Sequence, residues 1–308
     1  MVLTFFLITL FSIERLDIVE IGNLEDKGYY SDIKIDGKHG YVVAGKEGVV
    51  VLDLSNPAFP KKIGVIESMD YTYSLDKKGL TLFIADGRAG VRIFDISDMK
   101  NFSQSSFIPT KYSSLDIEVD GQYIYVAEGE GGLRIIDISQ LEFPTEIARF
   151  NSKINVRSLD IADGNAYLAN SEGIIILDIR NVDSLKNPTF IKTIDSVYKI
   201  ISDGRWLFAS GGSKDFIVSN IAFPQYPLTQ KIQGNFTGIE DIFISGFHLY
   251  LAKGESGVSI LNLLSPLNPE VVNHTLLIPE AKGIVVSGNL LFVTAGYDGL
   301  KVYKIIEE

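Results

Sequence analysis

The sequence contains no cysteine and few of the residue types that usually build catalytic or metal sites. Its 308 residues include one tryptophan and three histidines. The absence of cysteine excludes a disulfide framework, a thiol nucleophile and a thiolate metal site. The histidines (His39, His248 and His274) are scattered, with no HExxH pair, and no GxSxG elbow, Walker A loop or Gly-rich dinucleotide fingerprint occurs. The sequence therefore identifies no catalytic residue and no metal-ligand set, which favours a protein that is not an enzyme.

Basic residues are also scarce. The chain has 28 Lys and Arg against 39 Asp and Glu, which gives a net charge of −11 and a pI near 4.9. Nucleic-acid binding relies on clustered Lys and Arg that neutralise phosphates, and we find no such cluster. We therefore expect no nucleic acid among the partners.

Long apolar runs are limited to one stretch, residues 1–11. A membrane-spanning helix needs about 20 apolar residues, so this run is too short and we expect no integral membrane span. It fits the apolar region of a secretory signal peptide, although no Lys or Arg precedes it and the following residues form a poor cleavage site. We predict that residues 1–12 are a signal-peptide remnant and that the protein is exported to the cell surface, periplasm or extracellular space. A buried or frayed N-terminal strand is the alternative.

What the chain does have is a repeat, most regular in residues 115–150. Leu115, Ile117 and Val119 alternate with acidic residues, which is the period of a half-buried strand. Further strands are predicted over residues 123–127, 133–138 and 146–150, and glycine-rich or Asp-Gly turns separate the first three. Four short antiparallel strands make one blade.

Imperfect copies of this unit fill the chain. A small residue ends the second strand of each copy, at Ala44, Ala85, Ala127, Ala169, Ala209, Ala252 and Thr294. Successive gaps are 41, 42, 42, 40, 43 and 42 residues. A sevenfold period of this length, built wholly of strands, predicts an all-β fold, a seven-bladed β-propeller that forms one domain over residues 13–308. The last copy has only three strands, so we predict that residues 15–21 supply its fourth strand and close the ring.

The third-strand ends carry a recurring motif, for example Val51-Leu52-Asp53-Leu54-Ser55 and Ile135-Ile136-Asp137-Ile138-Ser139. With the preceding Tyr-Val-Ala and Gly-Leu elements, this pattern resembles the LVIVD-repeat family over most of the chain. The resemblance implies a β-propeller of the kind found largely in bacterial and archaeal surface or exported proteins, and it implies no shared catalytic chemistry. Copies five to seven depart from it, with Asn220, Asn262 and Lys304 at the Asp position.

Two sets of carboxylates recur. The first set (Asp53, Asp95, Asp137 and Asp178) ends third strands, where a carboxylate accepts hydrogen bonds from the backbone of the following turn. The second set (Asp32, Asp76, Asp116, Asp160 and Asp241) lies in first strands, which line the central channel of a propeller. Converging carboxylates there could bind calcium or pair with Lys199 and Lys282. The alternative is that they bond backbone or water between blades, and no Asp-rich calcium loop accompanies them.

Aromatic residues precede several first strands, on the face that also carries the turns between second and third strands. Such rings beside polar loops suit recognition of a peptide or glycan, although packing under the loops is the alternative. The fifth copy is the least regular, because residues 209–215 replace its short glycine turn. A copy that departs from the others often carries function, and sequence drift at a tolerant loop is the alternative. The candidate ligand-binding residues are Tyr30, Tyr73, Tyr112, Tyr198, Phe236, Lys199, Lys214 and Asp215.

We therefore predict a binding or scaffolding module at the cell surface, whose partner is a surface protein or a glycan. It would act as a monomer or as part of a larger surface assembly. Two alternatives remain open at this point: a hydrolase or lyase that acts on a glycan or peptide with carboxylates at the channel mouth, and a purely structural surface repeat.

Overall fold

The computed structural model describes residues 16–26, 28–151, 154–182, 185–193, 196–211, 216–232, 234, 236–276 and 278–307. The predicted signal segment and the candidates Lys214 and Asp215 lie outside these residues.

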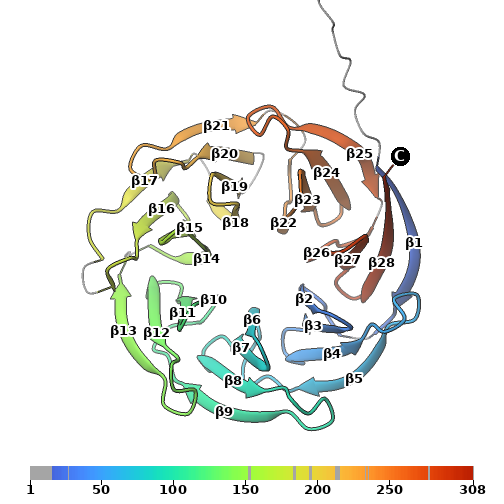
Figure 1. Cartoon of the computed structure of the whole chain (residues 1–308), viewed down its shortest axis with the longest axis horizontal. Coiled ribbons are helices and arrows are strands. Elements are labelled where there is room, and N and C mark those ends of the chain that lie inside the picture. Colours follow the sequence, from blue (N-terminus) through green and yellow to red (C-terminus); the bar gives the residue numbers. More distant parts are fainter. Residues whose placement is uncertain are drawn as a thin grey trace, which may run out of the picture.

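Seven four-stranded antiparallel sheets form a ring around a central channel, which confirms the predicted seven-bladed propeller (Figure 1). The innermost strands are β2 (Asp32–Asp36), β6 (Ser74–Lys78), β10 (Asp116–Asp120), β14 (Val156–Ala162), β18 (Val197–Ser202), β22 (Asp241–Ser245) and β26 (Ile284–Ser287). The second strands are β3 (His39–Val43), β7 (Thr81–Ala85), β11 (Tyr123–Ala127), β15 (Asn165–Asn170), β19 (Trp206–Gly211), β23 (His248–Ala252) and β27 (Leu290–Thr294).

The third strands are β4 (Val49–Asp53), β8 (Val91–Asp95), β12 (Leu133–Asp137), β16 (Gly173–Asp178), β20 (Phe216–Asn220), β24 (Val258–Asn262) and β28 (Leu300–Glu307). The outermost strands are β5 (Lys61–Ile66), β9 (Ser103–Ile108), β13 (Thr145–Phe150), β17 (Thr189–Lys192), β21 (Leu228–Ile232), β25 (Glu270–Leu276) and β1 (Leu16–Leu24).

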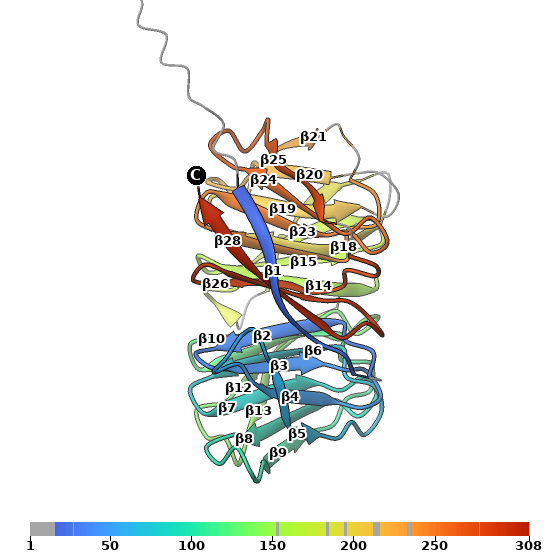
Figure 2. The ribbon, with the colours of Figure 1, turned by 90° about the vertical axis from the view of Figure 1, so that its right-hand side faces the viewer.

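The N-terminal strand closes the ring, as predicted. β1 pairs antiparallel with β28, from Leu16 opposite Glu307 to Leu24 opposite Leu300, with a register shift between Glu20 and Gly22. Figure 2 shows β1 running alongside β28 at the rim of the ring. The last blade is therefore completed by a strand from the other end of the described chain.

The core lies between blades. The second and third strands of each blade are buried on both faces, because neighbouring blades cover them. Tyr41 and Val43 of the first blade pack with Leu75 and Ile84 of the second in one such cluster. One blade cannot bury its apolar faces alone, so each blade depends on its neighbours in the ring for stability.

The register corrects the predicted repeat in two copies. In the fifth copy Ser210 pairs with Phe216 as Ala127 pairs with Leu133, so the residue equivalent to Ala127 is Ser210, not Ala209. The first copy is shifted in the other direction. Asp32 pairs with Val43 as Ser74 pairs with Ala85. The residue of the first copy that is equivalent to Ala85 is therefore Val43, not Ala44. Ala44 misled the alignment because it is small, but it belongs to the turn that follows β3.

The ring has two faces that differ in their loops. We call "connector face" the side that carries the turns between second and third strands and the connectors from each outermost strand to the next innermost strand. The opposite face carries the loops after the third strands, and there the recurring Asp residues act as predicted: Oδ1 of Asp53 accepts a hydrogen bond from Ser55 N at 2.8 Å. Asn220 and Asn262 make the same bond in the fifth and sixth blades, to Ala222 N at 3.1 Å and Leu264 N at 2.7 Å.

Candidate functional site

On the connector face, each incoming connector is tied to the turn of the blade before it. Thr72 N, for example, donates to the carbonyl of Gly45 at 3.0 Å, and the two residues form an isolated bridge. The same bridge joins Tyr30 to Gly296, Gly87 to Ser114, Gly129 to Val156 and Gly254 to Ala281. These bridges fix the backbone on either side of the bridging residue. Several aromatic residues lie at these flanking positions.

Four tyrosines from three blades lie together on this face; we call Tyr29, Tyr71, Tyr73 and Tyr297 the tyrosine cluster. The rings of Tyr71 and Tyr73 flank the bridging Thr72 and are 4.7 Å apart between centroids. The rings of Tyr29 and Tyr297 meet edge to face at 5.0 Å. Burial raises the pKa of Tyr71, and the phenols of Tyr29, Tyr73 and Tyr297 raise it further. Tyr73 and Tyr297 remain 44% and 68% exposed.

The turn below the cluster requires glycine. Gly45 has φ 55°, and a Cβ there would lie 2.7 to 2.9 Å from ring atoms of Tyr71. A side chain at this position would therefore strain the backbone and displace the ring. The Tyr71 ring is consequently supported by backbone rather than by a flexible side chain.

A carboxylate lies at each end of the tyrosine cluster. The side chain of Asp70 rests on Gly87, as does the Tyr73 ring, and Asp70 accepts a hydrogen bond from Arg88 N at 2.8 Å. The carboxylate of Glu280 rests on Gly296, directly before Tyr297, and Glu280 has φ 53°. A non-glycine residue with positive φ is uncommon and marks a position held by its surroundings.

Two of the candidate aromatic residues do not offer a binding surface. Tyr30 is fully buried and its hydroxyl donates to Asp26 at 2.8 Å. Phe236 is only 6% exposed and packs on Phe216, with 5.1 Å between ring centroids. Both rings pack under the loops, which is the alternative noted above.

Two other candidates carry cations of their own. The Lys111 ammonium lies 5.6 Å from the ring centroid of Tyr112. The Arg157 guanidinium lies 5.2 Å from the ring centroid of Tyr198, which is 43% exposed. Tyrosine rings in a connector and at the start of an innermost strand therefore serve as platforms for cations of the same chain.

The central channel is lined by the innermost strands, each of which is the inner edge of its sheet. Edge strands leave backbone N–H groups without a strand partner. Carboxylates of one blade accept these groups from the next blade: Leu159 N donates to Asp116 at 3.1 Å, Ile161 N to Glu118 at 3.0 Å, Val119 N to Asp76 at 2.8 Å and Ile284 N to Asp241 at 2.9 Å. These carboxylates therefore link the inner edges of neighbouring blades.

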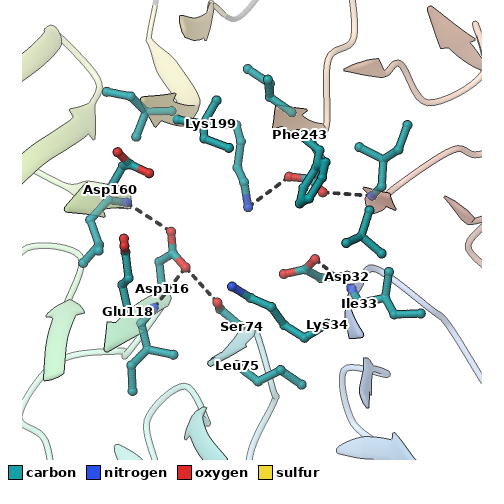
Figure 3. Close-up of a pocket in the computed structure, with 18 residues that line it drawn as sticks. Asp32, Ile33, Lys34, Ser74, Leu75, Asp116, Glu118, Asp160, Lys199 and Phe243 are labelled. Carbon is teal, nitrogen blue, oxygen red and sulfur yellow. Dashed lines mark hydrogen bonds and ion pairs between the residues drawn. The ribbon is translucent and has the colours of Figure 1, made fainter. Parts of the chain in front are cut away.

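Two lysines and Asp32 complete the channel wall (Figure 3). Lys199 pairs with Asp241 at 3.1 Å, and Lys34 pairs with Asp76 at 3.1 Å. Oδ1 of Asp32 accepts the N–H of the adjacent Ile33 at 2.7 Å, and no hydrogen bond from the next blade to Asp32 is found among the described residues. Lys282 does not enter this network; it pairs with Glu240 at 2.9 Å on the connector face.

Several channel groups have shifted pKa values. Burial raises the pKa of Asp32 to about 6, against the opposing charge of Lys199. Burial also raises the pKa of Asp160 to about 6, although Ser202 donates a hydrogen bond to it at 2.5 Å. Burial and then the charges of Asp160 and Asp76 raise the pKa of Glu118 to about 9.

The channel encloses a cavity of about 170 Å³, lined by Asp32, Asp116, Glu118, Asp160, Lys199 and Phe243 among others. Among the described residues, no three His, Asp or Glu side chains are grouped so that they could hold a metal ion. Nor does the described part of the chain contain a helix long and apolar enough to cross a membrane.

Two buried ion pairs beneath the connector face escaped the sequence analysis. Asp86 is fully buried and pairs with Arg92 at 3.1 Å; Glu128 is fully buried and pairs with Arg134 at 3.1 Å. Each acid and its arginine are six residues apart. The same acid-to-arginine spacing in two successive copies was the signal that could have revealed these pairs. The first copy lacks the pair and has the apolar residues Ala44 and Val50 at the equivalent positions.

These acids anchor the connectors that lead into their blades. Asp86 accepts Met69 N at 2.8 Å and the Thr72 hydroxyl at 3.2 Å. Glu128 accepts the Thr110 hydroxyl at 2.7 Å and also pairs with Arg149 at 2.6 Å. The connector with Tyr71 and Tyr73 is thus fixed from below by a buried carboxylate.

Comparison with known proteins supports the repeat and the fold. The LVIVD repeat model matches residues 27–67 and 113–152, which correspond to the first and third blades. A search of the curated proteins found no match.

Two solved structures show the same fold. The chain is similar to the β-propeller domain of Cps50 (Swd1) from Myceliophteria thermophila, with a TM-score of 0.71 and 14% identity over 95% of this chain and 99% of that one. It is also similar to the computationally designed protein Ika8, with a TM-score of 0.70 and 9% identity over 93% of this chain and 99% of that one. At these identities the likeness concerns the fold alone. The chain carries LVIVD repeats and folds as a seven-bladed β-propeller.

Proposed function

We propose that this protein is a non-catalytic recognition module that binds a surface protein or glycan through the tyrosine cluster of its connector face. A propeller with LVIVD repeats favours a binding or scaffolding role. The observation that carries the proposal is the convergence of four tyrosines from three blades on one exposed surface. Tyrosine is enriched where binding energy concentrates, because it offers a large contact area and has few rotatable bonds.

The surroundings of the cluster support recognition rather than incidental exposure. Bridges and the buried Asp86 hold the connector in place before any ligand arrives. Preorganised loops lose less conformational entropy on binding, so more of the contact energy appears as affinity. Export to a cell surface or extracellular space belongs to the same proposal and rests on residues 1–11.

A second candidate function is hydrolysis or elimination on a glycan or peptide by channel carboxylates. The raised pKa values of Asp160 and Glu118 favour it, because groups with such shifts act as general acids or bases near neutral pH. Both side chains already hold neighbouring blades together, however, Asp160 through Ser202 and Glu118 through Ile161. Loss of turnover in Asp160→Asn, with unchanged thermal unfolding, would favour the enzyme.

The binding role is tested with glycan and peptide arrays probed by the intact chain and by two matched variants. Tyr73→Ala with Tyr297→Ala removes the exposed part of the cluster. Phe143→Ala with Tyr226→Ala removes aromatic rings that are 74% and 82% exposed in loops of the opposite face. We expect binding to be lost in the first variant and kept in the second. Equal binding by both variants would place the site elsewhere, and no binding by the intact chain would favour a purely structural repeat.

A further inference from the structure

We infer that the tyrosine cluster recognises a cationic side chain, presented by an arginine- or lysine-rich segment of a partner protein. This inference rests on the proposed binding role of the connector face and specifies its ligand. Aromatic faces attract cations electrostatically, and the attraction is strongest where several rings surround the charge and carboxylates lie nearby.

The chain itself shows this use of tyrosine on the same face. The Tyr112 ring is covered by the adjacent Lys111, and the Tyr198 ring, at the start of β18, is covered by Arg157 of β14 in the preceding blade. In contrast, no cation of the described residues lies over Tyr73 or Tyr297, although these rings are 44% and 68% exposed. The cluster thus offers open rings in the environment where its neighbours hold a positive charge.

The two carboxylates at the ends of the cluster would add charge complementarity. Asp70 and the Tyr73 ring rest on the same turn glycine, and Glu280 lies beside Tyr297. Among the described residues, the one donor found to the Asp70 side chain is the backbone amide of Arg88, and none is found to Glu280. Both charges are therefore available to a ligand.

One lysine of the chain, Lys282, already contacts the cluster at Tyr29. Its side chain is hydrogen-bonded to Tyr29 and pairs with Glu240 at 2.9 Å, and its charge opposes the raised pKa of Tyr71. It is not found over Tyr73 or Tyr297, the two exposed rings of the cluster. The net charge of −11 for the whole chain also attracts a basic partner over longer distances. A neutral glycan would stack on the rings and donate its hydroxyls to Asp70 and Glu280, but it would lack the salt-sensitive charge attraction that a cation gains from them.

The test is isothermal titration of the full chain with three probes. The first is a short Gly/Ser peptide that carries arginines, the second is its counterpart with glutamine in their place, and the third is a neutral chitooligosaccharide. We expect the arginine peptide to bind at least about tenfold more tightly than the glutamine peptide, and less tightly at high salt. Asp70→Asn with Glu280→Gln should weaken it about fivefold, and Tyr73→Leu with Tyr297→Leu about tenfold.

A matched control carries Glu142→Gln and Tyr226→Leu, which alter an exposed acid and an exposed ring of the opposite face. It should bind the arginine peptide as the parent does. Cluster-dependent binding of the glutamine peptide or the oligosaccharide, insensitive to Asp70→Asn with Glu280→Gln, would overturn the cationic ligand but keep the binding role. No binding of any probe at the cluster would overturn both proposals.

Discussion

At the scale of single residues, the carboxylates of the channel have two opposing effects on stability. Asp76, Asp116 and Asp241 accept N–H groups that edge strands would otherwise leave unpaired. Glu118 does the same for Ile161, but it lies among other acids and its pKa is raised to about 9. A raised pKa means that the folded state binds the proton more tightly than the unfolded state does.

We therefore predict that Glu118→Gln changes how stability depends on pH. The parent should lose stability as the pH rises from about 4.5 towards 9. In this range Glu118 stays protonated in the folded protein but ionises in the unfolded chain, so each rise in pH favours the unfolded state. Glutamine imitates the protonated form and can still accept Ile161 N, so the variant should be more stable than the parent at pH 8, on the order of 1 kcal/mol. Urea unfolding at pH 5 and pH 8 measures this.

The control for this experiment is Glu142→Gln, an exposed substitution on the opposite face. It should leave the pH profile unchanged. A steeper loss of stability with pH in Glu118→Gln than in the parent would contradict the assignment of the proton to Glu118.

At the scale of elements, the second and third blades differ from the first in how they hold their incoming connectors. The first blade has Ala44 and Val50 where the second has the buried pair of Asp86 and Arg92. Buried ion pairs contribute little net stability, but removal of one partner leaves an uncompensated charge. Their distinctive effect here is to fix the connector with Tyr71 and Tyr73.

We predict that Asp86→Ala alone destabilises the protein by about 3 to 5 kcal/mol, because Arg92 is left buried without its partner. The double variant Asp86→Ala with Arg92→Val restores the pairing of the first blade and should recover much of that loss. Chemical denaturation of the parent, both single variants and the double variant gives the coupling energy. Additive effects of the two substitutions would contradict the ion pair as the cause.

At the scale of the whole molecule, ring closure depends on one strand. β1 contributes Leu16 to the core between the last two blades and packs Gly22 against the loop after β4, where a Cβ would lie 2.5 Å from the carbonyl oxygen of Pro57. Because each blade is stabilised by contacts with its neighbours, loss of one strand of the last blade should weaken the whole ring.

Deletion of residues 16–24 should therefore lower the unfolding temperature by roughly 10 °C or more and broaden the transition. Gly22→Val should also destabilise the protein, because the side chain meets backbone, whereas Val19→Thr at a 49% exposed position of β1 should have little effect. Differential scanning calorimetry measures all three. An unchanged, single transition in the deletion variant would contradict closure by β1.

Much of the fold could be predicted because the repeat averages out local ambiguity. Strand alternation recurs in seven copies, and the Asp of the third strand in four of them, so the misaligned residues Ala44 and Ala209 did not alter the architecture. The candidate site was harder to predict. Tyr30 and Tyr29 are neighbours of the same type, yet Tyr30 is buried and Tyr29 joins the tyrosine cluster.

The sequence by itself determined the blade, the number of blades, the strand that closes the ring and the presence of carboxylates in the innermost strands, because these follow from periods along the chain. Only the tertiary structure decided which side chains meet. It brought Tyr29, Tyr71, Tyr73 and Tyr297 together across three blades, and it engaged the channel carboxylates with backbone amides of the next blade. Closure of the ring is the physical reason, since it places residues about one repeat apart, and residues from the two ends of the chain, side by side.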